Sequence, residues 1–154
     1  MIWRNGKMSF KTIGVAVKKL HEDAVIPTYA NDGDAGFDFY VIGGGKIRAG
    51  ETKLFKTGLA MAIPKGYELQ VRSRSGLSLK AQIVVLNAPG TIDAGYRGEI
   101  GIILTNFSEK EYTVKKGDRV AQGVLNEVPR AKFHVVEDLP DSDRGQGGFG
   151  SSGK

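Results

Sequence analysis

The sequence predicts an all-β domain of the sandwich or barrel-like type, with one short helix. Apolar side chains recur at every second position in three segments, 66–74, 98–106 and 118–125. This period of two is typical of strands that bury one face. Glycine is abundant, at 22 of 154 residues, and it gathers with Asn, Asp and Pro between the apolar segments, where tight turns are needed. A chain of this length corresponds to one domain and can bury a substantial core.

The other elements are expected from the same pattern, in chain order. Further strands are expected at 11–17, 36–41, 52–63 and 132–136, and residues 76–82 are the one segment expected to form a short helix. Three sets of residues are expected to share a strand face: Tyr67, Leu69 and Val71; Ile100, Ile102 and Leu104; and Val120, Gln122 and Val124.

Composition divides the chain into three parts. Residues 1–10 are expected to be a dispensable extension, since Met8 could serve as a second start codon. Residues 11–138 form the β domain. Residues 139–154 hold five glycines and only two large apolar residues, Leu139 and Phe149. Such a segment buries too little apolar surface to offset its ordering entropy, so we expect a flexible arm unless a ligand or neighbour holds it.

The arm contains two nominal nucleotide-binding patterns, GxGxxG at 145–150 and GxxxxGK at 148–154. Neither predicts a Rossmann or Walker site, because no helix follows to receive a phosphate. Glycine N–H groups could still close around a phosphate, with Arg144, Ser151 and Ser152 as further donors and Phe149 stacking on a flat ligand. A solvated tail is the alternative interpretation.

Composition excludes several functional classes. The chain has no cysteine and only two histidines, which excludes disulfides, thiolate zinc sites, cysteine nucleophiles and multi-histidine metal sites. Its apolar runs are too short for a membrane span, and its start lacks a signal peptide, so we expect a cytoplasmic protein with no membrane partner. The net charge of +5 favours an anionic ligand. Nucleic acid is not expected, because lysines and arginines are dispersed without interleaved aromatic residues.

Two internal segments could carry chemistry. In 72–78, RSRSGLS, the side chains of Arg74 and Ser75 and the N–H of Gly76 could bind an anion where a strand gives way to a helix, although an ordinary helix cap explains the same residues. In 87–99, NAPGTIDAGYRGE, Asp93 has apolar neighbours, so partial desolvation could make it a general base, and Tyr96 could pack against a ligand. A turn aspartate and a core tyrosine are the ordinary alternatives.

Five segments together resemble, in order and spacing, the motifs of the trimeric deoxyuridine triphosphatases (dUTPases). They are AGFDFYV (35–41), RSGLS (74–78), NAPGTIDAGYRGE (87–99), KGDRVAQ (116–122) and RGQGGFGSSG (144–153). The resemblance runs from about residue 25 to the C-terminus. Three positions depart from the usual motifs, with Phe39 for leucine, Ser73 for a common proline and Ser152 for threonine, and the chemistry is retained.

The resemblance implies a β-clip, jelly-roll-like subunit, a homotrimer with three sites at subunit interfaces, and Mg²⁺-dependent hydrolysis of dUTP to dUMP and pyrophosphate. The arm of one subunit would close over a site built by the other two. The implied roles are these: Asp93 activates the water; Tyr96 lies under the deoxyribose; Asn87, Gly90, Thr91 and Ile92 read the uracil; Arg74, Ser75, Gly76 and Gln122 hold phosphates; Arg144, Phe149, Gly150, Ser151 and Ser152 close the lid; and Asp38 holds magnesium through water, with no direct protein ligand.

Two alternatives remain open. A deoxycytidine triphosphate deaminase shares the fold, but those enzymes carry a catalytic glutamate at a position that is Ile103 here. A dUTPase-like regulator that binds the nucleotide without catalysis is the second alternative.

Overall fold

The computed structural model describes residues 2–4, 7–9 and 11–148, and within these ranges the chain forms thirteen strands and one helix. The strands are β1 (Ile2–Arg4), β2 (Lys7–Ser9), β3 (Ala16–Lys19), β4 (Phe37–Tyr40), β5 (Gly45–Ile47), β6 (Thr52–Lys56), β7 (Leu59–Ala62), β8 (Tyr67–Ser73), β9 (Ile83–Val85), β10 (Gly90–Ile92), β11 (Gly101–Asn106), β12 (Tyr112–Val114) and β13 (Arg119–Glu127). The helix is α1 (Ser75–Ala81). The prediction of an all-β domain with one short helix is confirmed.

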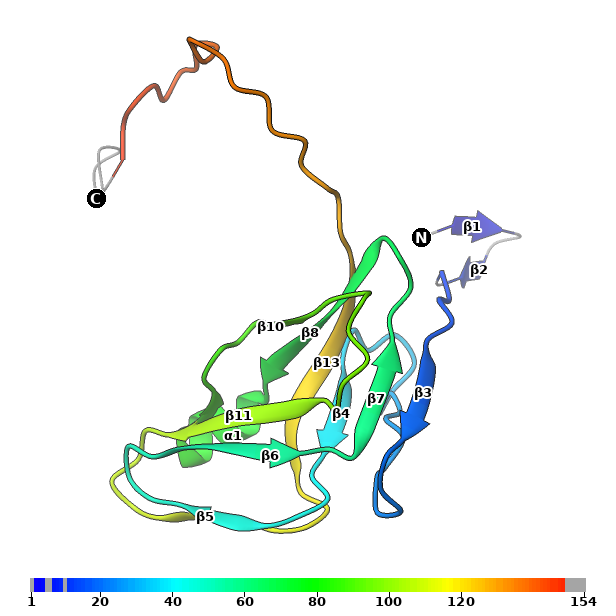
Figure 1. Ribbon diagram of the computed structural model, residues 1–154, viewed down its shortest axis with the longest axis vertical. Coiled ribbons are helices and arrows are strands. Elements are labelled where there is room, and N and C mark those ends of the chain that lie inside the picture. Colours follow the sequence, from blue (N-terminus) through cyan, green and yellow to red (C-terminus); the bar gives the residue numbers. More distant parts are fainter. Residues whose placement is uncertain (1, 5–6, 10, 149–154) are drawn as a thin grey trace.

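The strands pair into two principal antiparallel sheets (Figure 1). One sheet has the order β10-β8-β13-β4 and the other the order β6-β11-β9, with smaller pairs β12-β5, β3-β7 and β1-β2. Several neighbours are far apart in sequence, since β13 pairs with both β4 and β8. The first and fourth motifs therefore meet on one sheet, and the second motif begins directly after its strand β8.

One hydrophobic cluster joins the two sheets. On β11 and the residue before it, Ile100, Ile102 and Leu104 are 1%, 0% and 0% exposed, as the period of two predicts. On β8, Leu69 and Val71 are buried and Tyr67 is half-buried at the strand's start. These two strands confirm their predicted core faces.

The predicted face of β13 is confirmed only in part, since Val120 and Val124 are buried, but so are Ala121 and Gly123. The strand's register shifts between Arg119 and Ala121, so Val120 does not continue the alternation of the residues after it. Ala121 lies opposite Phe39 and Gly123 opposite Phe37, and these small residues face the core. A β carbon at position 123 would lie 2.8 Å from ring atoms of both phenylalanines, so the rings fill the space that a larger β13 side chain would need.

Other predicted boundaries also change. The expected strand 52–63 is broken at Thr57 and Gly58, because Gly58 has a φ of +68° and the Thr57 hydroxyl donates to the carbonyl oxygen of Ile100 at 2.7 Å. The expected strand 11–17 is replaced by β3, which begins at Ala16. The helix begins at Ser75 and ends one residue early, because Gln82 adopts the left-handed conformation with a φ of 54°.

The expected strand 132–136 is absent from the described part of the chain. After Val128, whose N–H bonds to the Gly66 carbonyl oxygen, the chain runs away from both sheets (Figure 1). Phe133 and Val135 are 92% and 103% exposed, so their alternating pattern has no strand partner among the described residues of this chain. The alternating apolar residues therefore indicate β propensity, but they form no strand among the described residues of this chain.

Candidate active site

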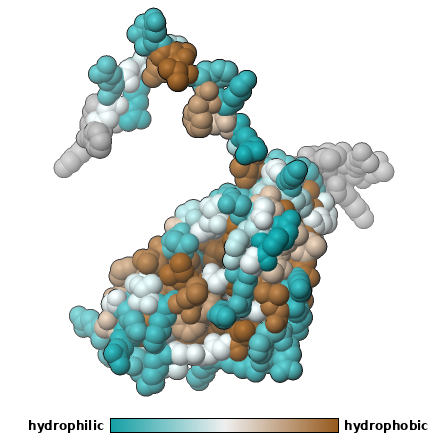
Figure 2. Space-filling view, viewed as in Figure 1, coloured by the Kyte–Doolittle hydropathy of each residue, from teal (hydrophilic) through white to brown (hydrophobic). Residues whose placement is uncertain are grey.

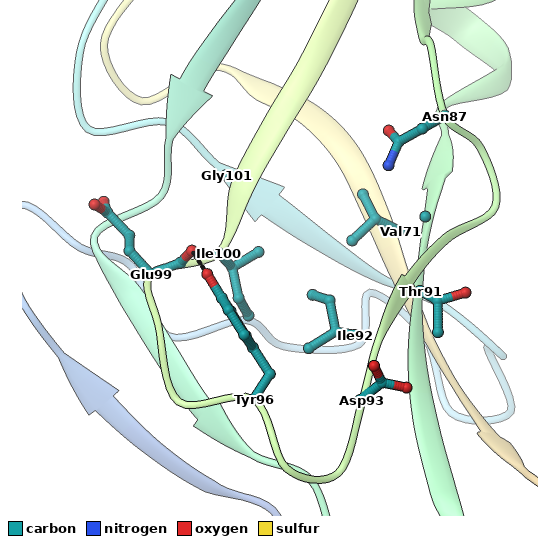
Figure 3. Close-up of a pocket in the computed structure, with 10 residues that line it drawn as sticks. Val71, Asn87, Thr91, Ile92, Asp93, Tyr96, Glu99, Ile100 and Gly101 are labelled. Carbon is teal, nitrogen blue, oxygen red and sulfur yellow. Dashed lines mark hydrogen bonds between the residues drawn. The ribbon is translucent and has the colours of Figure 1, made fainter.

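The segment after β9 forms a pocket of about 210 Å³ beside β8 (Figure 3). β10 pairs with β8, with Gly90 opposite Val71 and Ile92 opposite Leu69, and a loop then returns the chain to β11. The residues that line this pocket, called the hairpin pocket below, are Val71, Asn87, Gly90, Thr91, Ile92, Asp93, Tyr96, Glu99, Ile100 and Gly101. The structure thus brings together all six residues that were expected to bind uracil and sugar or to activate water.

The upper end of this pocket depends on a close approach between Asn87 and Gly90. A β carbon at position 90 would lie 2.9 Å from Nδ2 of Asn87, so a side chain there would displace the amide. Gly90 is buried, whereas Asn87 and Thr91 are exposed. The Asn87 amide therefore lies at the pocket's end in space that the missing side chain of Gly90 leaves open (Figure 3).

Asp93 and Tyr96 lie at the opposite end, on the turn that follows β10 (Figure 3). The Tyr96 N–H donates to the Asp93 carbonyl oxygen at 3.0 Å. Nη1 of Arg97 donates to the carbonyl oxygens of Ala94 and Tyr96, both at 2.7 Å, and closes the turn. A short, bonded turn fixes the spacing between the carboxylate and the aromatic ring.

The environments of these two residues differ from the sequence interpretation. Asp93 lies past the end of β10, on the turn, and is exposed. The expected partial desolvation of its carboxylate is therefore wrong for this single chain. Tyr96 is 45% exposed, which rules out the alternative of a core tyrosine. Its hydroxyl donates to the Glu99 carbonyl oxygen at 2.9 Å.

A second polar group lies where β8 ends, on the sheet that also contains β4 and β13. Nε of Arg74 lies 2.8 Å from Oδ1 of Asp38, and Nη1 of Arg119 lies 3.1 Å from Oδ2 of the same carboxylate. Nη1 of Arg74 also donates to the Arg119 carbonyl oxygen at 2.8 Å. Gln122 donates through Nε2 to the Ser73 carbonyl oxygen at 2.9 Å. Strand pairing thus brings Asp38, Arg74 and Gln122 close together.

The ordinary explanation of 74–76 as a helix cap receives little support. Arg74 occupies the N-cap position of α1 but makes no side-chain cap bond to the helix. Ser75 and Gly76 are exposed at the first turn. Their polar groups can therefore meet a ligand that approaches this end of the helix.

The two groups of site residues do not line the same pocket within one chain. Arg74, Ser75, Gly76 and Gln122 are not among the lining residues of the hairpin pocket. Asp38 and Gln122 instead line a separate depression with the loop residues Thr28, Ala30 and Asp34. One chain therefore presents the hairpin pocket and the group around Arg74 and Asp38 as two separate features.

The part of the arm that the structure describes, residues 139–148, lines neither the hairpin pocket nor the depression beside Asp38. Arg144 is exposed, and its Nε donates to the Gly147 carbonyl oxygen at 2.7 Å, within a local turn. The described part of the arm extends away from the β domain (Figure 1). Phe149, Gly150, Ser151 and Ser152 lie outside the described residues.

Sequence reasoning missed two residues, Arg119 and Glu99. Each lies inside a segment that was already recognised, 116–122 or 87–99, beside a residue with an expected role. Arg119 contacts the Asp38 carboxylate, and Glu99 lines the hairpin pocket. Proximity to an assigned residue was the available signal.

Among the described residues, no helix is long and apolar enough to cross a membrane. The same residues hold no cluster of three or more His, Cys, Asp or Glu side chains that could bind a metal ion.

Comparison with known proteins gives consistent results. The dUTPase family model matches residues 22–153. The chain is 48% identical over 139 residues to the deoxyuridine 5'-triphosphate nucleotidohydrolase of Helicobacter pylori strain Shi470, covering 90% of this chain and 96% of that protein. The dUTPase of Staphylococcus bacteriophage 80alpha, solved with dUPNHPP, superposes with a TM-score of 0.87 at 32% identity, covering 93% of this chain and 100% of that one. A mutant dUTPase from phage phi11 of S. aureus, solved to show the coordination of a structural Mg(II) ion, has a TM-score of 0.78 at 27% identity, covering 84% and 100%.

These matches place the chain in the class of jelly-roll-like β proteins, which confirms the predicted fold class. The family match spans more than half of the chain, and the Helicobacter relative is aligned over nearly its whole length. The chain belongs to the dUTPase family.

Proposed function

We propose that this protein hydrolyses dUTP to dUMP and pyrophosphate in the cytoplasm, which limits uracil in DNA and supplies dUMP for thymidylate synthesis. The observation that carries the proposal is the single hairpin pocket that collects the expected uracil, sugar and water-activating residues. Family membership supports the same activity, since the Helicobacter relative is named for it.

The uracil ring enters the hairpin pocket between apolar walls. Val71, Ile92 and Ile100 point into it (Figure 3). β10 is an edge strand, so one row of its peptide groups faces away from β8 and is available to the edge of the base. The backbone of Gly90–Ile92 and the Asn87 amide then bond to uracil. Cytosine presents the opposite donor and acceptor pattern at these positions and leaves polar groups unpaired.

Asp93 and Tyr96 act on the sugar and the reacting phosphate. The Asp93 carboxylate accepts a proton from a water aligned with the α-phosphorus, opposite the leaving pyrophosphate. The ring of Tyr96 lies under the deoxyribose and leaves no room for a 2′-hydroxyl. Attack of this water on the α-phosphorus breaks the bond to the bridging oxygen, and the pyrophosphate leaves with that oxygen.

The phosphates bind the second group of residues. Arg74 supplies charge, and Ser75, Gly76 and Gln122 supply donors where β8 meets α1. The Asp38 carboxylate, whose two oxygens lie against Arg74 and Arg119 in this chain, would hold a Mg²⁺ ion through water, and the triphosphate would supply the direct ligands. Bound in this way, the ion would neutralise phosphate charge as the leaving group departs.

A homotrimer brings the two groups of site residues together. Within one chain Arg74, Ser75 and Gly76 do not line the hairpin pocket, and Asp38 and Gln122 line a different depression, so we infer that a neighbouring subunit joins the two groups. An apolar sheet face supports this assembly. Leu54 on β6 is 62% exposed and lies opposite the half-buried Ile103 on β11, while Leu86 nearby is 53% exposed. Figure 2 shows apolar side chains gathered over this side of the β domain. Exposed apolar patches of this kind mark association surfaces.

The arm completes the site from another subunit. Arg144, Gly150, Ser151 and Ser152 close on the phosphates, and Phe149 stacks on the uracil. Closure excludes water other than the nucleophile.

The test of the reaction is pyrophosphate release from dUTP, dCTP, dTTP and UTP under the same conditions. We expect turnover with dUTP and little with the others. Ammonia release from dCTP would instead support a deaminase, although the position of its catalytic glutamate is occupied by the apolar Ile103. Tight dUTP binding without pyrophosphate release would support the regulator.

The test of the shared site is subunit mixing. A truncated subunit that ends before Arg144 keeps Asp93, and an Asp93→Asn subunit keeps its arm. We expect neither subunit to be active alone. We expect mixed trimers to recover activity, because an intact arm can reach a site that contains an unmutated Asp93. No recovery after verified subunit exchange would show that each arm serves the site whose Asp93 comes from its own chain.

A further inference from the structure

The ring of Tyr96 lies against the backbone of Gly98. A β carbon at position 98 would lie 2.6 Å from Cζ of Tyr96 and 3.0 Å from Cε2, and it would also overlap the phenol oxygen. Gly98 is not among the described glycines with a positive φ, so its backbone does not itself require glycine. The glycine is required by the space that the ring occupies.

The far end of the same ring is anchored by a hydrogen bond. The Tyr96 hydroxyl donates to the Glu99 carbonyl oxygen at 2.9 Å (Figure 3). A contact at Gly98 and a bond at Glu99 together restrict both the tilt and the swing of the ring.

Glu99 is in turn fixed to the sheets. Its Oε1 accepts the N–H of Gly58 at 2.9 Å, and its Oε2 lies 3.4 Å from Nζ of Lys56. Gly58 lies in the buried bend between β6 and β7. The anchor of the Tyr96 hydroxyl is therefore tied to the core of the domain, although the turn that carries Tyr96 is exposed.

We propose that Gly98 is a positioning residue for Tyr96, and that its missing side chain, with the Glu99 carbonyl, sets the ring position that selects deoxyribose over ribose. The inference rests on the proposed function, in which Tyr96 contacts the sugar. A ring rejects one extra hydroxyl only if it cannot move aside, because a mobile ring would make room at low cost. Gly98 is thus a determinant of sugar specificity that does not touch the sugar itself.

The test is a double-mutant cycle between Gly98→Ala and Tyr96→Ala, with the ratio of kcat/KM for dUTP over UTP as the readout. Gly98→Ala displaces the ring, so we expect this ratio to fall roughly tenfold or more. In the Tyr96→Ala background there is no ring to displace, so the same alanine should change the ratio by less than about twofold. A merely structural effect of Gly98→Ala would persist in both backgrounds.

A control in the same turn is Gly95→Ala. No heavy atom lies within 4 Å of a β carbon built at position 95, so this change alters backbone freedom without touching the ring. We expect its dUTP/UTP ratio to stay near that of the parent. An equal loss of selectivity in Gly95→Ala would attribute the effect to loop stiffness and overturn the inference.

Two further measurements keep the inference testable if Gly98→Ala folds poorly. Tyr96→Phe removes the bond to Glu99 and keeps the ring, so the ratio should fall several-fold. Calorimetric binding of dUMP against UMP reports the same selectivity without turnover. If the parent does not hydrolyse dUTP, the proposed function fails. If the parent does and Tyr96→Ala lowers the ratio, but Gly98→Ala and Tyr96→Phe leave it unchanged, the inference fails alone.

Discussion

Asn106 offers the sharpest stability prediction in the β domain. It ends β11, is 0% exposed, and satisfies both ends of its amide. Nδ2 donates to the carbonyl oxygens of Ile47 at 2.9 Å and Lys110 at 2.7 Å. Oδ1 accepts the N–H of Ser108 at 2.9 Å and its hydroxyl at 2.7 Å. One side chain thus joins β5, β11 and the loop before β12.

Asn106→Ala removes all four hydrogen bonds. Each hydrogen bond contributes about 1 kcal/mol net to stability. In the variant the polar groups of Ser108 and Lys110 lie near solvent and can bond to water instead, which reduces the loss. The Ile47 carbonyl lies in the core and loses its partner. The expected loss in the free energy of unfolding is about 3 kcal/mol. For a domain of this size that loss lowers Tm by about 6–12 °C. Thermal unfolding by circular dichroism, at equal protein concentration because assembly shifts Tm, measures it.

Asn126→Ala is the matched control. The Nδ2 atom of Asn126 is buried but has no hydrogen-bond partner among the described residues. The substitution removes a buried donor that makes no hydrogen bond, so no hydrogen bond is lost. It should therefore change the free energy of unfolding by less than about 1 kcal/mol. An equal loss in both variants would refute the assignment of the Asn106 effect to its hydrogen bonds.

Three functional predictions follow from the site. Asp93→Asn keeps the shape but cannot accept a proton, so turnover of dUTP should fall by ~10² or more while nucleotide binding persists; turnover within threefold of the parent would remove Asp93 from the mechanism. Tyr96→Ala should narrow the preference for dUTP over UTP in kcat/KM, and an unchanged preference would place the sugar contact elsewhere. Truncation before Arg144 should leave Tm nearly unchanged, because the described part of the removed segment is largely exposed, and should abolish dUTP turnover in the pyrophosphate assay; a truncated enzyme with full turnover would show that the arm has no part in catalysis.

The hairpin pocket could be predicted from sequence because its residues are nearly contiguous. Positions 87–96 surround one short strand and the turn after it, so a correct strand and turn place Asn87, Asp93 and Tyr96 along one pocket. The core faces of β8 and β11 could also be predicted, because each strand is long enough for its period of two to repeat.

Other features depend on partners that local patterns do not identify. Strands of three residues, such as β5, β9 and β12, are too short to show a period, and they form against residues distant in the chain. On β13 two phenylalanine rings of β4 fill the space beside Gly123, so small residues are buried that the period of two does not predict. The contact of Arg119 with Asp38 joins residues 81 apart. Asp93 is exposed because the fold of this chain leaves its turn uncovered. Its apolar sequence neighbours do not show which residues cover that turn.

The exit of the chain after Val128 bears on how fast the enzyme can open and close. Fifteen residues, 129–143, separate Val128 from Arg144, and fully extended they span roughly 50 Å. A tether of this kind gives the arm's tip an effective concentration on the order of millimolar at any site within reach. Weak individual contacts then suffice for frequent closure. In the proposed mechanism no single contact has to be strong, so the arm would also leave quickly, and the same length of chain would serve both substrate capture and product release.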